Sequence, residues 1–135
     1  MKKVRGYIFS RPFMDERVPQ HIQNQVIRDY CMRKQLEFLL SSTEYAMPDC
    51  YLMLEQVLDN LHTVSGIVAY SLSQLPENQA RRKVIYEKFT NEKKALYFAV
   101  EGIKASSKED FERIEMFWSI RLTLPYCAKT QDIYK

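Results

Sequence analysis

Polar side chains that could carry out chemistry stand directly after four apolar runs of the sequence. Two of them are carboxylates, Glu44 and Glu101. A pair of carboxylates can supply the general base and the general acid of a proton-transfer reaction. Ser10 is a candidate nucleophile, and we predict these three residues as catalytic. The predicted substrate-binding residues are Arg11, Arg17, Gln20, Tyr45, Ser71, Ser73 and Gln74.

The same residues also have structural interpretations. Arg11 can hold a carboxylate or phosphate through two parallel hydrogen bonds, but it or Arg17 could instead pair with the two carboxylates. Tyr45 can donate a hydroxyl or stack on a ring. The serines are favoured as caps before helices. A nucleophilic Ser10 would need a base, and His21 is the only candidate near it in sequence.

The elements that must position these residues can be read from the apolar pattern. Four strand candidates lie at residues 4–9, 36–40, 66–70 and 94–100. The uncharged run 66–70 is typical of a strand buried on both faces of a parallel sheet. Helical spacing marks residues 19–34, 49–61, 76–89 and the stretch from 107 onward. Asp49 is the predicted N-cap of the second helix, and Ser107 with Asp110 forms a capping box for the last.

The alternation of strands and helices predicts one α/β domain over residues 1–135. Residues 125–135 show no clear period and are predicted as a C-terminal tail that is loosely ordered or contacts a partner. Short connections between parallel strands form right-handed crossovers. We expect a three-layer sandwich with a four-stranded parallel sheet, with room for a fifth strand, in the order 2-1-3-4 and helices on both faces. The candidate residues would then meet at the carboxyl ends of the strands, where open α/β sheets bind ligands.

The composition argues against several classes of protein. A net charge of +3, from 20 basic and 17 acidic residues, is too mild for nucleic-acid binding. The basic cluster 81–83 (RRK) is expected on a solvated face. No apolar run approaches the roughly 20 residues of a membrane span, and the start lacks a signal-peptide core. Three cysteines without a Cys-x-x-Cys spacing predict no metal site and a reducing, cytoplasmic location. With only three glycines there is no Gly-rich phosphate loop, so we expect no cofactor.

The architecture resembles the flavodoxin-like catalytic domain of resolvase-type serine recombinases. The residues that carry this resemblance are 6–8 (GYI), Gln20, Gln23 and 68–75 (VAYSLSQL). That family follows its third strand with Asp-Arg-Leu-x-Arg, where this chain has 73–77 (SQLPE), and its Arg-x-Ser is replaced by 9–11 (FSR). Because arginines stabilise a phosphoryl transition state, the resemblance implies the fold but not an active recombinase.

A second resemblance, to the sporadic carbohydrate cluster proteins, covers nearly the whole chain. It rests on residues 5–13 (RGYIFSRPF), 17–21 (RVPQH), 42–47 (STEYAM), 52–55 (LMLE), 69–72 (AYSL) and 98–102 (FAVEG). Members of that family are bacterial proteins encoded within gene clusters for surface polysaccharide or lipopolysaccharide sugars. The resemblance implies biosynthesis of cell-surface carbohydrate as the context and assigns no reaction.

Two functional hypotheses follow. The first, which the polar residues favour, is a small enzyme that modifies a nucleotide sugar or activated sugar acid by acid/base chemistry at the strand ends. The second is a non-catalytic accessory or regulatory subunit that binds another enzyme of the pathway. Trp118 and the tail could make that contact or a homodimer. A concave pocket with an unpaired carboxylate would indicate the enzyme, whereas paired charges at the strand ends would indicate the accessory protein.

Overall fold

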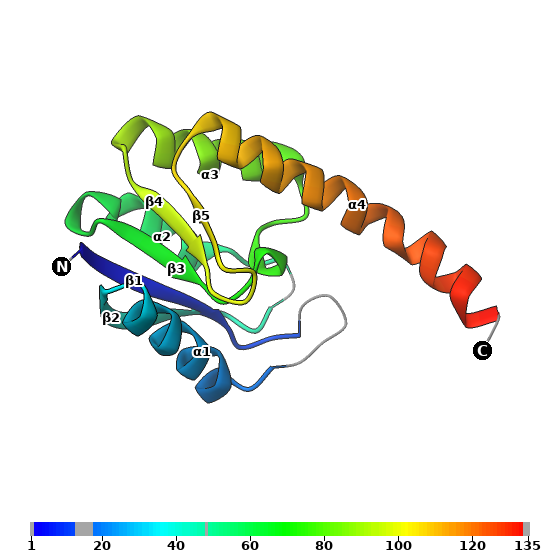
Figure 1. Ribbon diagram of the computed structural model, residues 1–135, viewed down its shortest axis with the longest axis horizontal. Coiled ribbons are helices and arrows are strands. Elements are labelled where there is room, and N and C mark those ends of the chain that lie inside the picture. Colours follow the sequence, from blue (N-terminus) through cyan, green and yellow to red (C-terminus); the bar gives the residue numbers. More distant parts are fainter. Residues whose placement is uncertain (1, 13–17, 48, 134–135) are drawn as a thin grey trace.

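The computed structural model describes residues 2–12, 18–47 and 49–133, with side chains as far as residue 120. A five-stranded sheet in the order β2-β1-β3-β4-β5 forms its centre (Figure 1). Strands β1 (Lys2–Phe9), β2 (Leu36–Glu44), β3 (Gly66–Ala69) and β4 (Ala95–Phe98) are parallel, which confirms the predicted order 2-1-3-4.

The fifth strand makes the sheet mixed rather than wholly parallel. β5 (Ile103–Ala105) pairs antiparallel with β4. The connection between them is far too short for the crossover that a parallel neighbour requires, so the chain turns back as a hairpin. Gly102, with φ of 67°, stands in this turn and donates its N–H to the Phe98 carbonyl at 2.9 Å. Its left-handed backbone favours glycine.

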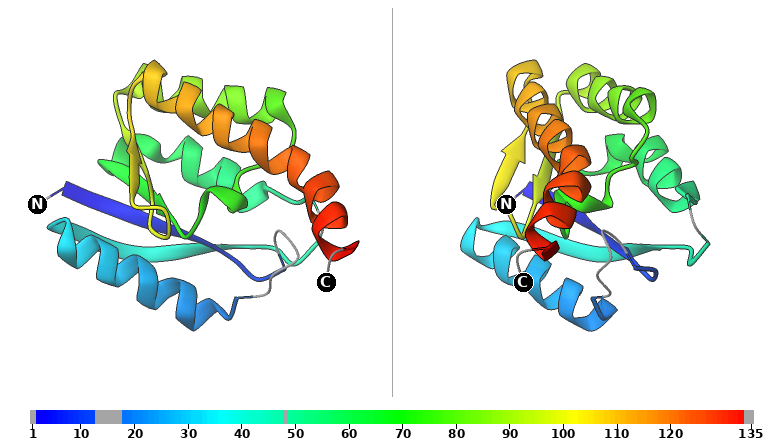
Figure 2. Two further views of the ribbon diagram at one scale, coloured as in Figure 1. Left: turned by 45° about the vertical axis from the view of Figure 1, so that its right-hand side comes forward. Right: turned by 90° about the vertical axis from the view of Figure 1, so that its right-hand side faces the viewer.

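The helices cover the two faces of the sheet unequally. The connection through α1 (Gln20–Arg33) leads from β1 to one edge of the sheet, whereas those through α2 (Leu52–Asp59) and α3 (Gln79–Glu92) lead toward the other edge. Right-handed crossovers in opposite directions place their helices on opposite faces. α4 (Lys108–Ile133) packs on the same face as α2 and α3. Figure 2 shows α1 alone on its side of the sheet.

Two hydrophobic clusters fill the spaces between these layers. The larger one lies under α2, α3 and α4 and includes Phe89, Phe98 and Trp118, none more than 1 % exposed. The smaller one lies under α1 and includes Ile27 and Val68. Five strands span roughly 20 Å and one helix about 10 Å, so α1 covers only part of its face. Trp118, predicted as a contact surface, is a core residue instead.

The second strand is longer, and the second helix shorter, than predicted. β2 continues through residues 41–44, because β1 pairs with it along that length, up to Phe9 opposite Glu44. α2 begins at Leu52, and the predicted N-cap Asp49 stands in a turn with φ of 57°. Neither difference could be read from local pattern, because pairing with β1 decides where β2 ends and a side chain from the end of β2 decides where α2 begins.

The last two helices also differ from prediction at their ends. α3 begins at Gln79 rather than at 76, since the Asn78 side chain accepts a hydrogen bond from the Arg81 N–H at 3.1 Å. The capping box of α4 is confirmed, with Ser107 and Asp110 exchanging hydrogen bonds at 3.2 and 3.3 Å. α4 runs to Ile133, so most of the predicted tail is helical. No helix in the described part of the chain is long and apolar enough to cross a lipid bilayer.

Candidate functional site

Glu44, a predicted catalytic residue, closes the N-terminal end of α2 from a buried position. Only 1 % of it is exposed. Its carboxylate accepts hydrogen bonds from the N–H groups of Met53 at 3.1 Å and Leu54 at 3.0 Å, and from the Tyr7 hydroxyl at 2.8 Å. The first N–H groups of a helix have no partner within it, and the helix dipole favours a negative charge there. Burial, reinforced by the Glu44 charge, raises the pKa of Tyr7 far above its usual range, so Tyr7 remains a donor.

Arg11 braces the loop between β2 and α2. It is 9 % exposed, and its guanidinium carbon lies 4.3 Å from the centre of the Phe9 ring and 5.0 Å from that of Tyr51. Its Nη1 donates to three loop carbonyl groups at 2.8–3.1 Å, those of Tyr45, Met47 and Cys50. The guanidinium group that was predicted to bind a substrate is therefore already hydrogen-bonded to backbone carbonyls. The alternative ion pair between Arg11 and Glu44 is not among the salt bridges of the described residues.

Two buried amides join the ends of β1 and β3. Gln74 donates through Nε2 to Gln23 Oε1 at 2.8 Å and accepts from the Tyr70 N–H at 3.0 Å. Gln23 in turn donates to the carbonyls of Phe9 and Val18 at 2.9 and 2.8 Å. The two side chains are at most 1 % exposed. A buried amide is costly unless it is hydrogen-bonded, so Gln74, predicted to bind substrate, holds the framework together.

Glu101, Ser71 and Ser73 form a cap at the end of β3. The Glu101 carboxylate accepts from the Ser71 hydroxyl at 2.8 Å and from the Leu72 N–H at 3.0 Å. The Ser71 hydroxyl accepts from the Ser73 N–H at 3.2 Å, at the start of the 3-10 turn η2 (Leu72–Gln74). The structural interpretation of Ser71 as a cap is thus confirmed. Glu101 also lines a hollow of about 220 Å³ on the α4 side of the sheet.

The remaining predicted site residues are Ser10, Gln20, Tyr45 and Arg17. The Ser10 hydroxyl donates to the backbone carbonyl of Glu44 at 2.6 Å, so a carbonyl rather than a base receives its proton. Gln20 is exposed at the first position of α1, and Tyr45 is 50 % exposed. Arg17 lies outside the described residues. Among the described residues of the predicted set, Ser10, Arg11, Glu44, Ser71, Gln74 and Glu101 each take part in hydrogen bonds within the protein.

The two carboxylates are also separated by the topology of the sheet. Glu44 ends β2, and Glu101 follows β4, which is three strand positions away. Three strand spacings amount to roughly 14 Å, and each carboxylate is directed to its own cap. Within the described part of the chain, no group of three or more His, Cys, Asp or Glu side chains could hold a metal ion.

Arg82 was predicted on a solvated face and is instead 2 % exposed. It donates to Glu115 of α4 at 2.7 and 3.0 Å, and its guanidinium carbon lies 4.5 Å from the centre of the Trp118 ring. The Tyr86 hydroxyl donates to the same carboxylate at 2.7 Å. The Arg82 hydrogen bonds lower the pKa of Glu115, despite the opposing effect of burial, while burial and the Glu115 contact raise the pKa of Tyr86. This cluster joins α3 to α4.

The sequence carries a signal for two buried polar side chains that were not predicted as such, Gln23 and Arg82. Gln23 precedes Ile27 by four residues, and Arg82 precedes Ile85 by three and Tyr86 by four. Residues at these spacings share one face of a helix. The period thus places both polar side chains on buried faces, where a hydrogen-bonded structural role is expected.

Compared by sequence, the chain matches no family model and no curated protein. Compared by structure, it is similar to a resolvase family site-specific recombinase from Streptococcus pneumoniae, with a TM-score of 0.61 and 12% identity over 97% of this chain and 96% of that one. It is also similar to the N-terminal catalytic domain of TP901-1 integrase, with a TM-score of 0.59 and 14% identity over 94% and 98% of the two chains.

A third similar structure is the C-terminal catalytic domain of ISC1926 TnpA, an IS607-like serine recombinase. Its TM-score is 0.52, with 13% identity over 81% of this chain and 76% of that one. The expected resolvase-like α/β fold is therefore confirmed. Identities this low establish the fold alone, because unrelated functions share folds.

Proposed function

We propose that the chain is a non-catalytic accessory or regulatory protein of bacterial surface-carbohydrate biosynthesis that binds a sugar or nucleotide-sugar ligand. The carbohydrate context comes from the sequence resemblance described above. The non-catalytic role is supported by the geometry of the strand ends. On this proposal the protein acts in the cytoplasm, where the thiols of Cys31 and Cys50, both free in the described structure, stay reduced.

The observation that carries the proposal is the engagement of both candidate carboxylates by the backbone. Glu44 accepts from two N–H groups of α2, and Glu101 accepts from the Leu72 N–H. A hydrogen bond to a charged group contributes about 1.5–3 kcal/mol. Protonation of Glu44 during catalysis would weaken several such bonds at once. A residue that stabilises a helix start in this way is poorly suited to exchange protons with a substrate.

Recombination of DNA is not part of the proposal. The serine and arginine that follow β1 are bonded to backbone carbonyls, Ser10 to that of Glu44 and Arg11 to those of the loop. The Asp-Arg pair that recombinases carry after the third strand is replaced by Ser73-Gln74, and Gln74 is buried in the amide pair. A phosphoryl transition state would find no cluster of free arginines at these positions.

Proton exchange with solvent tests the proposal. The purified protein is incubated in D₂O with UDP-glucose and glucose 1-phosphate, and the sugar protons are followed by NMR. We expect binding without incorporation of deuterium and without a new product. Deuterium incorporation that is lost in Glu101→Gln, while the variant keeps its fold, would establish the acid/base enzyme instead.

A further inference from the structure

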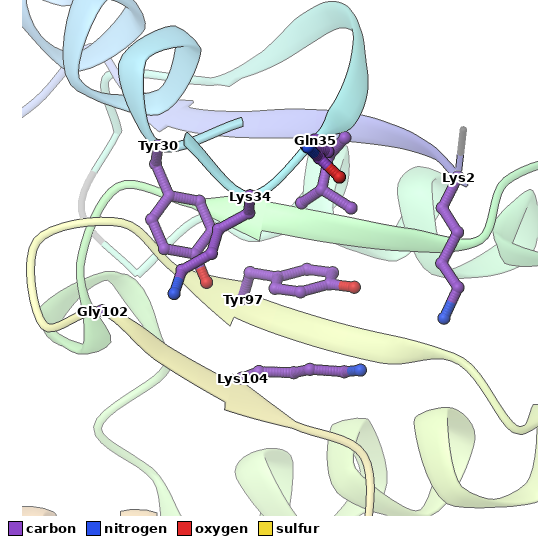
Figure 3. A pocket seen from close by; sticks show the side chains of 8 residues that line it. Lys2, Tyr30, Lys34, Gln35, Tyr97, Gly102 and Lys104 are labelled. Atoms are coloured by element: carbon purple, nitrogen blue, oxygen red, sulfur yellow. The ribbon is translucent and has the colours of Figure 1, made fainter. Parts of the chain in front are cut away.

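The uncovered part of the α1 face forms a pocket of about 520 Å³. It lies between the end of α1, the first residues of β1 and β2, and the β4–β5 hairpin, as Figure 3 shows. This volume is within the range of small-molecule sites. We call it the lysine–tyrosine pocket, after the lining residues Lys2, Lys34, Lys104, Tyr30 and Tyr97.

Two tyrosines present unused hydroxyl groups in this pocket. Tyr30 and Tyr97 are 2 % and 4 % exposed, and their rings meet edge to face with centres 6.1 Å apart. Neither hydroxyl has a hydrogen-bond partner among the described residues, and neither oxygen is fully enclosed. A tyrosine this deeply buried normally has a partner for its hydroxyl. The pocket is the space in which a ligand could supply one.

Three lysines from three different elements add positive charge without a counter-charge. Lys2 begins β1, Lys34 caps α1 and Lys104 lies in β5. None of them forms an ion pair within the described part of the chain, and no acidic residue lines the pocket. In Figure 3 the Lys104 side chain extends alongside the Tyr97 ring, whose centre is 6.0 Å from its nitrogen.

These groups define the chemistry of the ligand. Ammonium groups bind phosphate as point charges, and phenol hydroxyls donate to phosphoryl or sugar oxygens. The pocket lies at the C-terminal end of α1, where the helix dipole repels anions, so the lysines must supply the whole attraction. Two tyrosine hydroxyls that open into a hollow suit a small molecule better than the backbone of a nucleic acid.

We propose that the lysine–tyrosine pocket binds a phosphate- or diphosphate-bearing sugar. This inference rests on the proposed function and gives it a site on the opposite face of the sheet from the hollow that Glu101 lines. Tyr30 and Tyr97 donate hydrogen bonds to the ligand, and Lys2, Lys34 and Lys104 neutralise its phosphate groups. Burial raises the pKa of both tyrosines, so both hydroxyls keep their protons at neutral pH.

The test is a calorimetric titration with UDP-glucose, glucose 1-phosphate, inorganic pyrophosphate and a short duplex DNA. Lys34→Ala and Lys104→Ala should each weaken binding of the phosphorylated sugars about tenfold or more. Lys83→Ala is the matched control, because it removes an exposed lysine of α3 and changes the net charge equally. Its affinity should equal that of the wild type.

Tyr97→Phe separates a binding role from a structural one. The variant removes only a hydroxyl that has no partner among the described residues, so its melting temperature should stay unchanged while affinity for UDP-glucose falls several-fold. Equal affinity for Tyr97→Phe and wild type would remove this hydroxyl from the site. Circular dichroism confirms that each variant folds.

Several results would overturn the pocket. The pocket would be refuted if no phosphate probe showed saturable binding up to about 10 mM, or if Lys83→Ala weakened binding as much as Lys34→Ala does. It would also be refuted if duplex DNA were the ligand that bound most tightly. Binding of pyrophosphate as tight as that of both sugars would show a phosphate site without sugar recognition. Lys104 lines both this pocket and the hollow beside Glu101, whereas Lys34 lines only this pocket of the two. Loss of binding in Glu101→Gln but not in Lys34→Ala would refute the pocket and leave the proposed function standing. Binding in the pocket accompanied by turnover would refute the non-catalytic function and leave the pocket standing.

Discussion

The buried carboxylate of Glu44 decides how the strand ends are interpreted. If it caps α2, its replacement should damage the fold rather than an activity. Glu44→Gln places an amide N–H₂ against N–H donors, and we expect a loss of about 3 kcal/mol in the free energy of unfolding. That corresponds to a fall of roughly 6–12 °C in melting temperature for a domain of this size. Differential scanning calorimetry measures it.

Glu101→Gln is the matched comparison for that experiment. Glu101 is partly exposed and accepts from one N–H and one hydroxyl, so its variant should lose less stability than Glu44→Gln. If Glu44→Gln melts at the wild-type temperature, Glu44 is not a structural cap, and its role as a catalytic base regains support.

The Arg82–Glu115 pair should make stability depend on pH in the acid range. The folded pKa of Glu115 is lowered from its ordinary value of 4.5, chiefly by the Arg82 hydrogen bond. A carboxylate with a lowered pKa stabilises the folded state above its unfolded pKa, and this contribution is lost as the pH falls through the folded value. The stability difference between wild type and Glu115→Gln should therefore shrink as the pH is lowered from 6 to 3.

Urea unfolding at a series of pH values measures this difference. The carboxylate of Asp110 serves as a comparison for that of Glu115. Its pKa is also lowered, but mainly by the backbone hydrogen bond of Ser106 and not by a buried arginine. A difference between wild type and Glu115→Gln that stays constant from pH 6 to 3 would contradict the assigned role of the pair.

Among the elements, α3 carries a position where the backbone and the residue type disagree. Lys93 follows the last residue of α3 with φ of 56°, and its N–H and that of Lys94 bond to the carbonyls of Thr90 and Phe89. A left-handed residue at a helix end is usually glycine, since other residues are strained there. Lys93→Gly should therefore raise stability by about 1 kcal/mol, measured by urea unfolding.

The same substitution inside the helix should have the opposite sign. Lys83→Gly replaces an exposed residue within α3 and should cost about 1 kcal/mol. Equal destabilisation by both glycines would mean that the left-handed conformation of Lys93 carries no strain in the folded protein.

The order and type of the elements could be predicted from sequence, but several boundaries could not. The apolar runs and the 3.6-residue spacing are local properties, and they identified β1 to β4 and α1 to α4. The extension of β2 through 41–44 depends on pairing with β1, and the start of α2 depends on the carboxylate of Glu44, which the end of β2 places against the first N–H groups of the helix. Such contacts leave no periodic signal. β5 has only three residues, too few to show a recognisable strand pattern in the sequence.

The roles of the candidate site residues could not be decided from sequence for a related reason. Serine, glutamate and glutamine after a strand are the residue types that bind ligands, but they also cap helices and bridge strand ends. Which N–H group each meets depends on the tertiary fold. The sequence did not indicate a binding role for Tyr30 and Tyr97 either, because each lies within the apolar pattern of a predicted helix or strand and is therefore interpreted as a core residue. Their open hydroxyls become visible only when the unequal helix cover of the sheet is known.

For the whole molecule, the predicted homodimer remains to be measured. The distal half of α4 leaves the body of the domain in Figure 1. We expect light scattering to give twice the chain mass of 16.1 kDa, and a variant that ends at Ile120 to be monomeric with its core residues retained. A measured mass equal to that of one chain, at a protein concentration about 100 times a micromolar dissociation constant, would exclude the dimer.

We propose that the ligand binds beside α1 and not at the carboxyl ends of the strands. A ¹H–¹⁵N NMR titration with UDP-glucose tests it most directly, because every backbone amide reports its own surroundings. We expect shifts concentrated at Lys2, Lys34, Gln35 and Lys104, with the sugar itself chemically unchanged. Shifts concentrated instead at Ser71, Ser73 and Glu101, together with conversion of the sugar, would contradict it.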